Sequence, residues 1–136
     1  MGRWFRLNQL KRMPDPEQAI GKVIYKIVTP AQWAIAESNG EFHGAPIDLK
    51  DGYIHFSTPQ QVRETVEKHF QGQAQLLIVS VDADQLGDEL KWEPSRGGDL
   101  FPHLYGCLAM ASVISVEELP LGECGKHIFP EGIAAK

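Results

Sequence analysis

The sequence predicts an α+β or mixed α/β fold, with a partly antiparallel sheet and two short helices. Two predicted strands, at 23–28 and 53–57, are each followed by the same helix-start pattern, Thr-Pro-x-Gln. Beyond the second of these units, the apolar runs are short and separated by turn residues, which is typical of antiparallel strands. The 136 residues suffice for one hydrophobic core. We therefore expect an N-terminal arm over residues 1–22 and a single globular domain over residues 23–136.

The first strand is expected at residues 23–28, a run rich in β-branched residues. The residues before it alternate charges with prolines and show no hydrophobic period. Thr29 is a suitable N-cap for the helix that follows. Pro30 fits the first helical position, and Gln32 completes a capping box. The helix is expected to end at Asn39-Gly40, a common C-terminal signal.

The second unit repeats this pattern, with a strand at residues 53–57 and Thr58 as the N-cap of a helix that begins at Pro59. This helix would place three apolar side chains on one face and end before Gly72; they are Val62, Val66 and Phe70. The apolar run 76–81 predicts a buried strand. Shorter strands are expected at 90–92, 104–109 and 112–118, and the Gly- and Pro-rich tail after them is expected to pack along the surface.

Charge and composition exclude several classes of protein. The net charge of −5 argues against a membrane-surface or sequence-independent nucleic-acid partner, which would require clustered basic residues. The most apolar window, residues 104–116, is too short to span a bilayer. Two cysteines do not make a disulfide framework, so we expect a cytoplasmic protein. The histidines stand singly and no closed zinc motif is present, so we expect no metal.

The segment 92–99 concentrates polar chemistry around a Gly-Gly pair. Its candidate ligand-binding residues are Trp92, Ser95 and Arg96, and Glu93 is a candidate catalytic carboxylate. Glycine permits positive φ and close approach to a ligand, and loops on rigid scaffolds often carry binding residues. The alternative is an ordered structural loop in which Arg96 pairs with Glu93 or Asp99.

The segment 53–57 predicts a second part of the site. Alternation places Ile54 and Phe56 in the core, so Tyr53, His55 and Ser57 face the opposite way and form a candidate pocket floor next to Thr58. The alternative is a solvent-facing strand on which His55 is merely exposed.

A third set of candidates follows the Gly-Gly loop. If the chain is extended there, His103 and Tyr105 share one face, although His103 could equally be a buried histidine bonded to backbone. Because Arg96 suits phosphate and His55 precedes a helix start, we expect Arg96 or His103 to lie close enough to His55 to contact one ligand jointly.

These motifs together resemble those of the bacterial family called domain of unknown function 952. The resemblance covers roughly residues 23–118 and rests on Ile24-Tyr25-Lys26-Ile27, Asp51 to Thr58, Val81-Asp82, Trp92 to Gly98 and Phe101 to Gly106. That family is distantly similar to the ADP-ribosyltransferase-like fold. The resemblance implies a split, mixed sheet whose central cleft receives NAD or a related nucleotide, with NAD as a substrate and His55 and Ser57 near its ribose. It also leads us to expect a late catalytic glutamate, for which only Glu117-Glu118 stands in the expected region.

The resulting functional hypothesis is a protein that binds, and as an enzyme would process, NAD, ADP-ribose or a related nucleotide. An ADP-ribosyl or phosphotransferase-like activity would use Glu93 and His55. The ligand-binding residues would be Tyr53, Ser57, Thr58, Trp92, Ser95, Arg96, His103 and Tyr105. The alternatives are a non-catalytic nucleotide- or metabolite-binding module and a protein-interaction domain.

Overall fold

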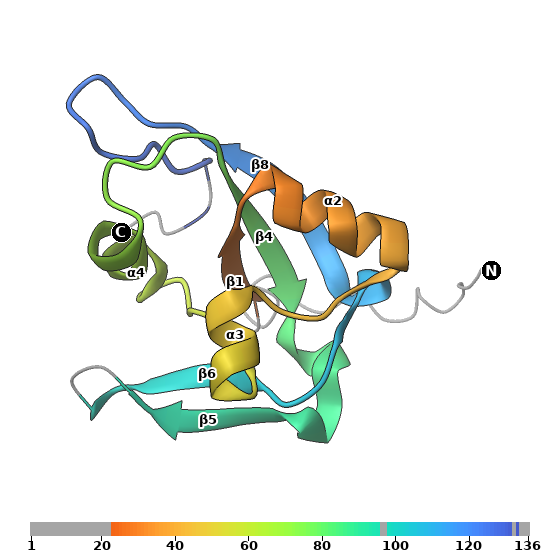
Figure 1. Ribbon diagram of the computed structural model, residues 1–136. Helices are drawn as coiled ribbons and strands as arrows, with labels where there is room; N and C mark the ends of the chain where they lie inside the picture. Colours follow the sequence, from red (N-terminus) through yellow and green to blue (C-terminus); the bar gives the residue numbers. More distant parts are fainter. Residues whose placement is uncertain (1–22, 96–97, 132, 134–136) are drawn as a thin grey trace.

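The computed structural model describes residues 23–95, 98–131 and 133 and shows an α+β fold built on three small sheets (Figure 1). The first sheet has the order β1–β4–β8, formed by Val23–Val28, Leu76–Asp82 and Val113–Leu119. The second has the order β3–β6–β5, formed by Ile54–His55, Leu100–Leu104 and Leu90–Pro94. The third pairs β2, Glu41–Phe42, with β7, Leu108–Ala109.

All strand pairs within the described residues are antiparallel, so the expected mixed sheet is corrected to antiparallel sheets. Three α-helices accompany them: α2, Pro30–Asn39; α3, Pro46–Asp51; and α4, Val62–His69. Two 3₁₀ segments, Ala83–Glu89 and Met110–Ser112, precede β5 and β8. In Figure 1 the β1–β4–β8 sheet runs through the middle of the view, with the β5–β6 hairpin below it and α4 to the left.

Strands β1 and β4 of the β1–β4–β8 sheet are buried on both faces, which explains why β4 reads as a continuous apolar run. One face packs against α2 and the β3–β6 region and carries Ile24, Val28, Val79 and Val81. Helix α2 contributes Trp33 and Ala36 to this contact. The β3–β6 region contributes Ile54, Phe56 and Leu104. The other face carries Tyr25, Ile27, Leu76 and Ile78 and packs against Val62 and Val66 of α4. The central sheet therefore fixes the positions of both the second sheet and α4.

The start of α2 confirms the capping-box prediction. The Thr29 hydroxyl accepts a hydrogen bond from the Gln32 backbone, the Gln32 side chain accepts one from the Thr29 N–H, and Gly40 closes the helix at φ 85°. The second helix start differs, because α4 begins at Val62 after a turn and its N-cap is Gln61. Only the return half of the box forms there, from the Thr58 N–H to the Gln61 side chain. The prediction that Thr58 caps a helix beginning at Pro59 is therefore wrong.

The two threonines provide a matched pair for a stability test. Thr29→Ala removes an N-cap hydroxyl and should lower the free energy of unfolding by about 1 kcal/mol. Thr58→Ala, at the start of a turn and outside any helix cap, should lower it by clearly less. Urea unfolding of both variants checks this, and equal losses would contradict the assignment of Thr29 as the cap.

Other boundaries also differ from expectation. The strand expected at 104–109 is divided into β6, which begins at Leu100, and the two-residue β7. Helix α3 was not expected from the sequence, because its six residues are too few to show a hydrophobic period. Within the described part of the chain, no helix is long and apolar enough to cross a membrane.

Candidate functional site

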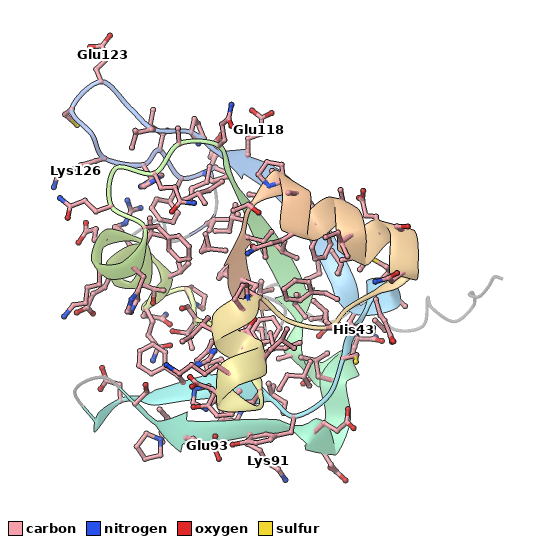
Figure 2. The ribbon with its side chains drawn as sticks, in the orientation of Figure 1. His43, Lys91, Glu93, Glu118, Glu123 and Lys126 are labelled. Carbon is pink, nitrogen blue, oxygen red and sulfur yellow. The ribbon has the colours of Figure 1, made fainter. Side chains whose placement is uncertain are left out.

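One face of the β3–β6–β5 sheet gathers two histidines, two tyrosines and a glutamate. The register pairs His55 of β3 with His103 of β6, and His103 with Lys91 of β5. Opposite residues share a face and alternate residues return to it. This face, formed by Tyr53, His55, Glu93, His103 and Tyr105, is called the histidine face below. Figure 2 shows Lys91 and Glu93 side by side on β5.

His55 is held by a carboxylate on each side of its ring. Its Nδ1 lies 2.6 Å from Oδ1 of Asp48, and its Nε2 lies 2.9 Å from Oδ2 of Asp51. The backbone N–H of His55 also donates to Asp48. Each ring nitrogen of His55 therefore lies within hydrogen-bond distance of a different carboxylate. Asp48 is buried and Asp51 is partly exposed. A ligand from solvent could therefore replace Asp51 at the His55 ring more easily than Asp48.

Asp48 is the buried centre of a wider polar network. Its Oδ2 lies 2.8 Å from the Lys26 ammonium and accepts a hydrogen bond from the N-cap N–H of α3, at Ala45. Burial alone would raise the pKa of Asp48. The hydrogen bond from His55, the charge and hydrogen bond of Lys26, and the Ala45 N–H outweigh this and hold the pKa at about 2. Asp48 is therefore ionised at neutral pH and fixes the orientation of His55.

Lys26 is buried in the middle of β1 and points toward Asp48 from the core face of the central sheet. Burial lowers the pKa of its ammonium group, and the charge of Asp48 opposes that effect. A buried cation is tolerated only when it is paired, so Lys26 and Asp48 depend on each other. The pair links the central sheet to α3 and, through His55, to the histidine face.

On the other side of the face, Glu93 accepts hydrogen bonds from two side chains. Nδ1 of His103 lies 2.7 Å from Oε1, and the Tyr105 hydroxyl donates to Oε1 at 2.8 Å and to Oε2 at 3.1 Å. The hydrogen bond from His103, followed by that from Tyr105, lowers the pKa of Glu93. The same bond raises the pKa of Tyr105. Glu93 is thus held as a carboxylate beside a neutral phenol.

The rings of the histidine face pack against one another. Tyr53 stacks on His103 with centroids 4.2 Å apart and lies 4.7 Å from His55 and 5.1 Å from Tyr105. The His55 and His103 rings meet edge to face at 5.5 Å. His103 is only 3% exposed, whereas Tyr105 is one of the more exposed aromatic residues. The arrangement therefore presents a buried histidine beneath a partly open aromatic rim.

The structure brings five of the predicted site residues together on the histidine face and places other predicted residues away from it. Ile54 and Phe56 are buried, as the alternation predicted, and His103 lies close to His55, as expected for a shared site. Arg96 lies outside the described residues. Ser57 is buried and bonded to Thr65, so the expectation that it lines the same open face as His55 is corrected.

Three further predicted binding residues lie elsewhere. Trp92 pairs with Pro102 and so occupies the opposite face of β5 from Glu93. The Ser95 N–H donates to the Asp99 carbonyl at the base of the loop. Thr58 begins the turn before α4.

The sequence reasoning missed Asp48, Asp51 and Lys26 as site residues. A signal was present for Lys26, since it interrupts an apolar strand at a position that alternation places with Ile24 and Val28. A buried charge requires a partner, and such a partner must come from elsewhere in the fold. Asp48 also carried a signal, because Asp two residues after Pro46 suits the third position of a short capped helix.

A cavity of about 270 Å³ lies away from the histidine face, between α4 and the C-terminal segment. Its lining includes Arg63, Val66, Lys126, His127 and Phe129. The Arg63 guanidinium lies over the Phe129 ring. The concentration of paired ionisable groups makes the histidine face the stronger functional candidate.

Comparison with known proteins places the chain in a family. Residues 27–116 match the family described as "Protein of unknown function (DUF952)". No curated protein matches the chain. The crystal structure of protein CC0527 from Caulobacter crescentus is similar, at 45% identity and a TM-score of 0.75, covering 78% of this chain and 93% of that one. Its solution NMR structure matches at 46% identity and a TM-score of 0.70, covering 77% and 90%. The chain therefore belongs to the DUF952 family.

Proposed function

We propose that the histidine face binds a nucleotide-type ligand, with ADP-ribose and NAD as its representatives. The observation that carries this proposal is the direct cross-strand pairing of His55 and His103, whose rings lie 5.5 Å apart and whose Nδ1 atoms each face a carboxylate. A carboxylate on Nδ1 orients each ring, and in His55 a ligand would reach Nε2 in place of Asp51. The choice of ADP-ribose and NAD rests on the expectation, drawn from the sequence resemblance, that the fold is ADP-ribosyltransferase-like.

The position of Asp51 supports an anionic ligand. Its partly exposed carboxylate lies against Nε2 of His55, where an anionic oxygen of a ligand would accept the same hydrogen bond. An exposed ion pair of this kind contributes at most about 1 kcal/mol. A phosphate or carboxylate can therefore displace Asp51, whereas buried Asp48 remains in place and keeps the His55 ring oriented. The partly exposed ring of Tyr105 is available to pack against a base.

The ligand proposal predicts opposite effects for two neighbouring changes. His55→Gln should weaken ADP-ribose binding at least tenfold, because it removes the imidazole nitrogen that would donate to an anionic oxygen of the ligand. Asp51→Asn should strengthen binding, because it removes the competing carboxylate. Isothermal titration with ADP-ribose, NAD and ADP at low salt checks both changes, because exposed charge contacts are screened at high salt.

His43→Gln is the matched control, since His43 is also paired with a carboxylate but lies outside the histidine face. It should leave binding unchanged. The proposal fails if none of the three nucleotides binds, or if His43→Gln weakens binding as much as His55→Gln. The circular dichroism spectrum of each variant confirms that it is folded.

Turnover is a second candidate, favoured by the ionised Glu93 on the rim of the face. Cleavage of the nicotinamide–ribose bond develops positive charge on the ribose, which a carboxylate stabilises. In the present arrangement, His103 and Tyr105 occupy this carboxylate, so it must exchange a hydrogen bond before it can contact a ribose. Nicotinamide release from NAD that Glu93→Gln abolishes while ADP-ribose still binds would identify an enzyme. Binding without release identifies a non-catalytic module.

A further inference from the structure

A separate group of metal-binding side chains lies on the small β2–β7 sheet. The ligand atoms of Glu41, His43 and Cys107 all lie within 4.8 Å of one another, with 2.9 Å between the His43 Nε2 and a Glu41 oxygen. In Figure 2 the labelled His43 lies at the right of the view, while Glu93 of the histidine face lies at the bottom. The group uses none of the residues assigned above to ligand binding.

The register of the sheet explains why these three residues meet. Glu41 pairs with Ala109 and Phe42 with Leu108, so continuing the pairing by one step sets His43 opposite Cys107. Glu41 and His43 are two residues apart and share a face. The buried Phe42 and Leu108 anchor the opposite face in the core. The constellation is therefore positioned by paired strands, and its members are far apart in the sequence.

We propose that Glu41, His43 and Cys107 bind a Zn²⁺ ion, with a water molecule as the fourth ligand. Thiolate, imidazole and carboxylate are the three ligand types that zinc uses in proteins. Zinc bonds of about 2.0–2.3 Å in a tetrahedron place ligand atoms about 3.3–3.7 Å apart. The observed spacing reaches this with small side-chain rotations, which the exposed positions of His43 and Cys107 allow.

The surroundings add negative charge that favours a cation. The Glu89 carboxylate lies where a Cβ on residue 106 would be, so glycine at this position leaves room for it next to Cys107. The Glu41 and Glu89 carboxylates both act electrostatically on the Cys107 side chain. A bound cation would be attracted by the same two carboxylates. Three protein ligands with water in the fourth position is an established zinc coordination pattern.

Cobalt substitution tests the proposal, because tetrahedral Co²⁺ reports a thiolate ligand through a sulfur-to-metal charge-transfer band. The reduced full-length protein should bind one Co²⁺ with this band, and Zn²⁺ should displace it. Cys107→Ser should abolish the band. His43→Gln should weaken Zn²⁺ binding by more than about 100-fold, because losing a residue that only hydrogen-bonds to a metal ligand costs about 10–100-fold.

The chain offers two matched controls, Cys124→Ser and His127→Gln, which alter the other exposed cysteine and another exposed histidine. Both should retain the band and the affinity. Absence of a charge-transfer band in the wild-type protein, or a band that survives Cys107→Ser and disappears in Cys124→Ser, would overturn the proposal. His55→Gln should leave the band intact, so failure of the zinc site and failure of the nucleotide site are distinguishable.

Discussion

Asp48→Asn is expected to lower the free energy of unfolding by about 3–5 kcal/mol. The Asp48 side chain is almost fully buried, and its two oxygens accept hydrogen bonds from Lys26, His55 and Ala45. Asparagine leaves the Lys26 ammonium buried without a countercharge, which is the costly way to break an internal ion pair. Urea unfolding at neutral pH measures the change.

Asp51→Asn is the matched control, because Asp51 contacts the same histidine from a partly exposed position. Its loss should cost no more than about 1 kcal/mol. If Asp48→Asn does not fold, the double variant Asp48→Asn with Lys26→Met should restore folding, since replacing both partners removes the unpaired charge. Similar small losses for both single variants would contradict a central role for Asp48.

The same carboxylate makes stability depend on acid. Its pKa is lowered in the folded protein from 3.8 to about 2, so the unfolded chain binds the proton more readily. The resulting stabilisation of about 2 kcal/mol is complete above about pH 5 and is lost as the pH falls toward about 2. Unfolding curves from neutral pH downward should therefore show the gap between wild type and Asp48→Asn narrowing over that range.

Local signals in the sequence predicted the parts of the fold that depend on local interactions. The Thr29-Pro30-x-Gln32 box forms because its donors and acceptors lie within one helical turn. The same letters at Thr58 do not form a full box, because the chain there first makes the turn that leads from β3 to α4. A motif describes what a segment can form, and the neighbouring elements decide whether it does.

Strand boundaries were harder to predict because pairing partners set them. The sequence predicted one strand at 104–109, beyond Pro102. Proline lacks the N–H that a strand ladder uses. In the structure, β6 runs through Pro102 and pairs on both sides. The Pro102 carbonyl still accepts a hydrogen bond from the Phe56 N–H. Because β3 has only two residues, few further backbone hydrogen bonds are needed on that side of β6. Tertiary pairing thus extends β6 across a residue that normally breaks a strand.

The candidate site divides in the same way. Alternation alone predicted that Tyr53 and His55 share a face and that His103 and Tyr105 do so. That the two faces coincide follows from the β3–β6 register, which links distant segments. The Lys26–Asp48 pair depends on contact between the central sheet and α3, for which one sequence holds only the indirect signal of a charge in an apolar strand.

Phe56→Ala is expected to lower the free energy of unfolding by about 3–5 kcal/mol. Phe56 is 2% exposed and packs in the core between the central sheet and β3–β6, with Ile24 and Leu104 in the same cluster. Its N–H donates to Pro102, and the next residue, Ser57, exchanges two backbone hydrogen bonds with Tyr25 of β1. The side chain therefore packs where the two sheets join, and alanine would leave a cavity there that the short β3 cannot close.

Leu49→Ala is the control, since Leu49 is a large apolar side chain that is 66% exposed on the neighbouring α3. It should change stability by no more than about 0.5 kcal/mol. Phe56→Leu, which keeps most of the volume, should cost less than about 1.5 kcal/mol and provides a folded comparison if the alanine variant does not fold. Because β3 also carries His55, the Phe56→Ala variant should bind ADP-ribose more weakly. The Leu49→Ala variant should bind it as the wild type does. A Phe56→Ala protein as stable as Leu49→Ala would show that the joint between the sheets does not depend on this side chain.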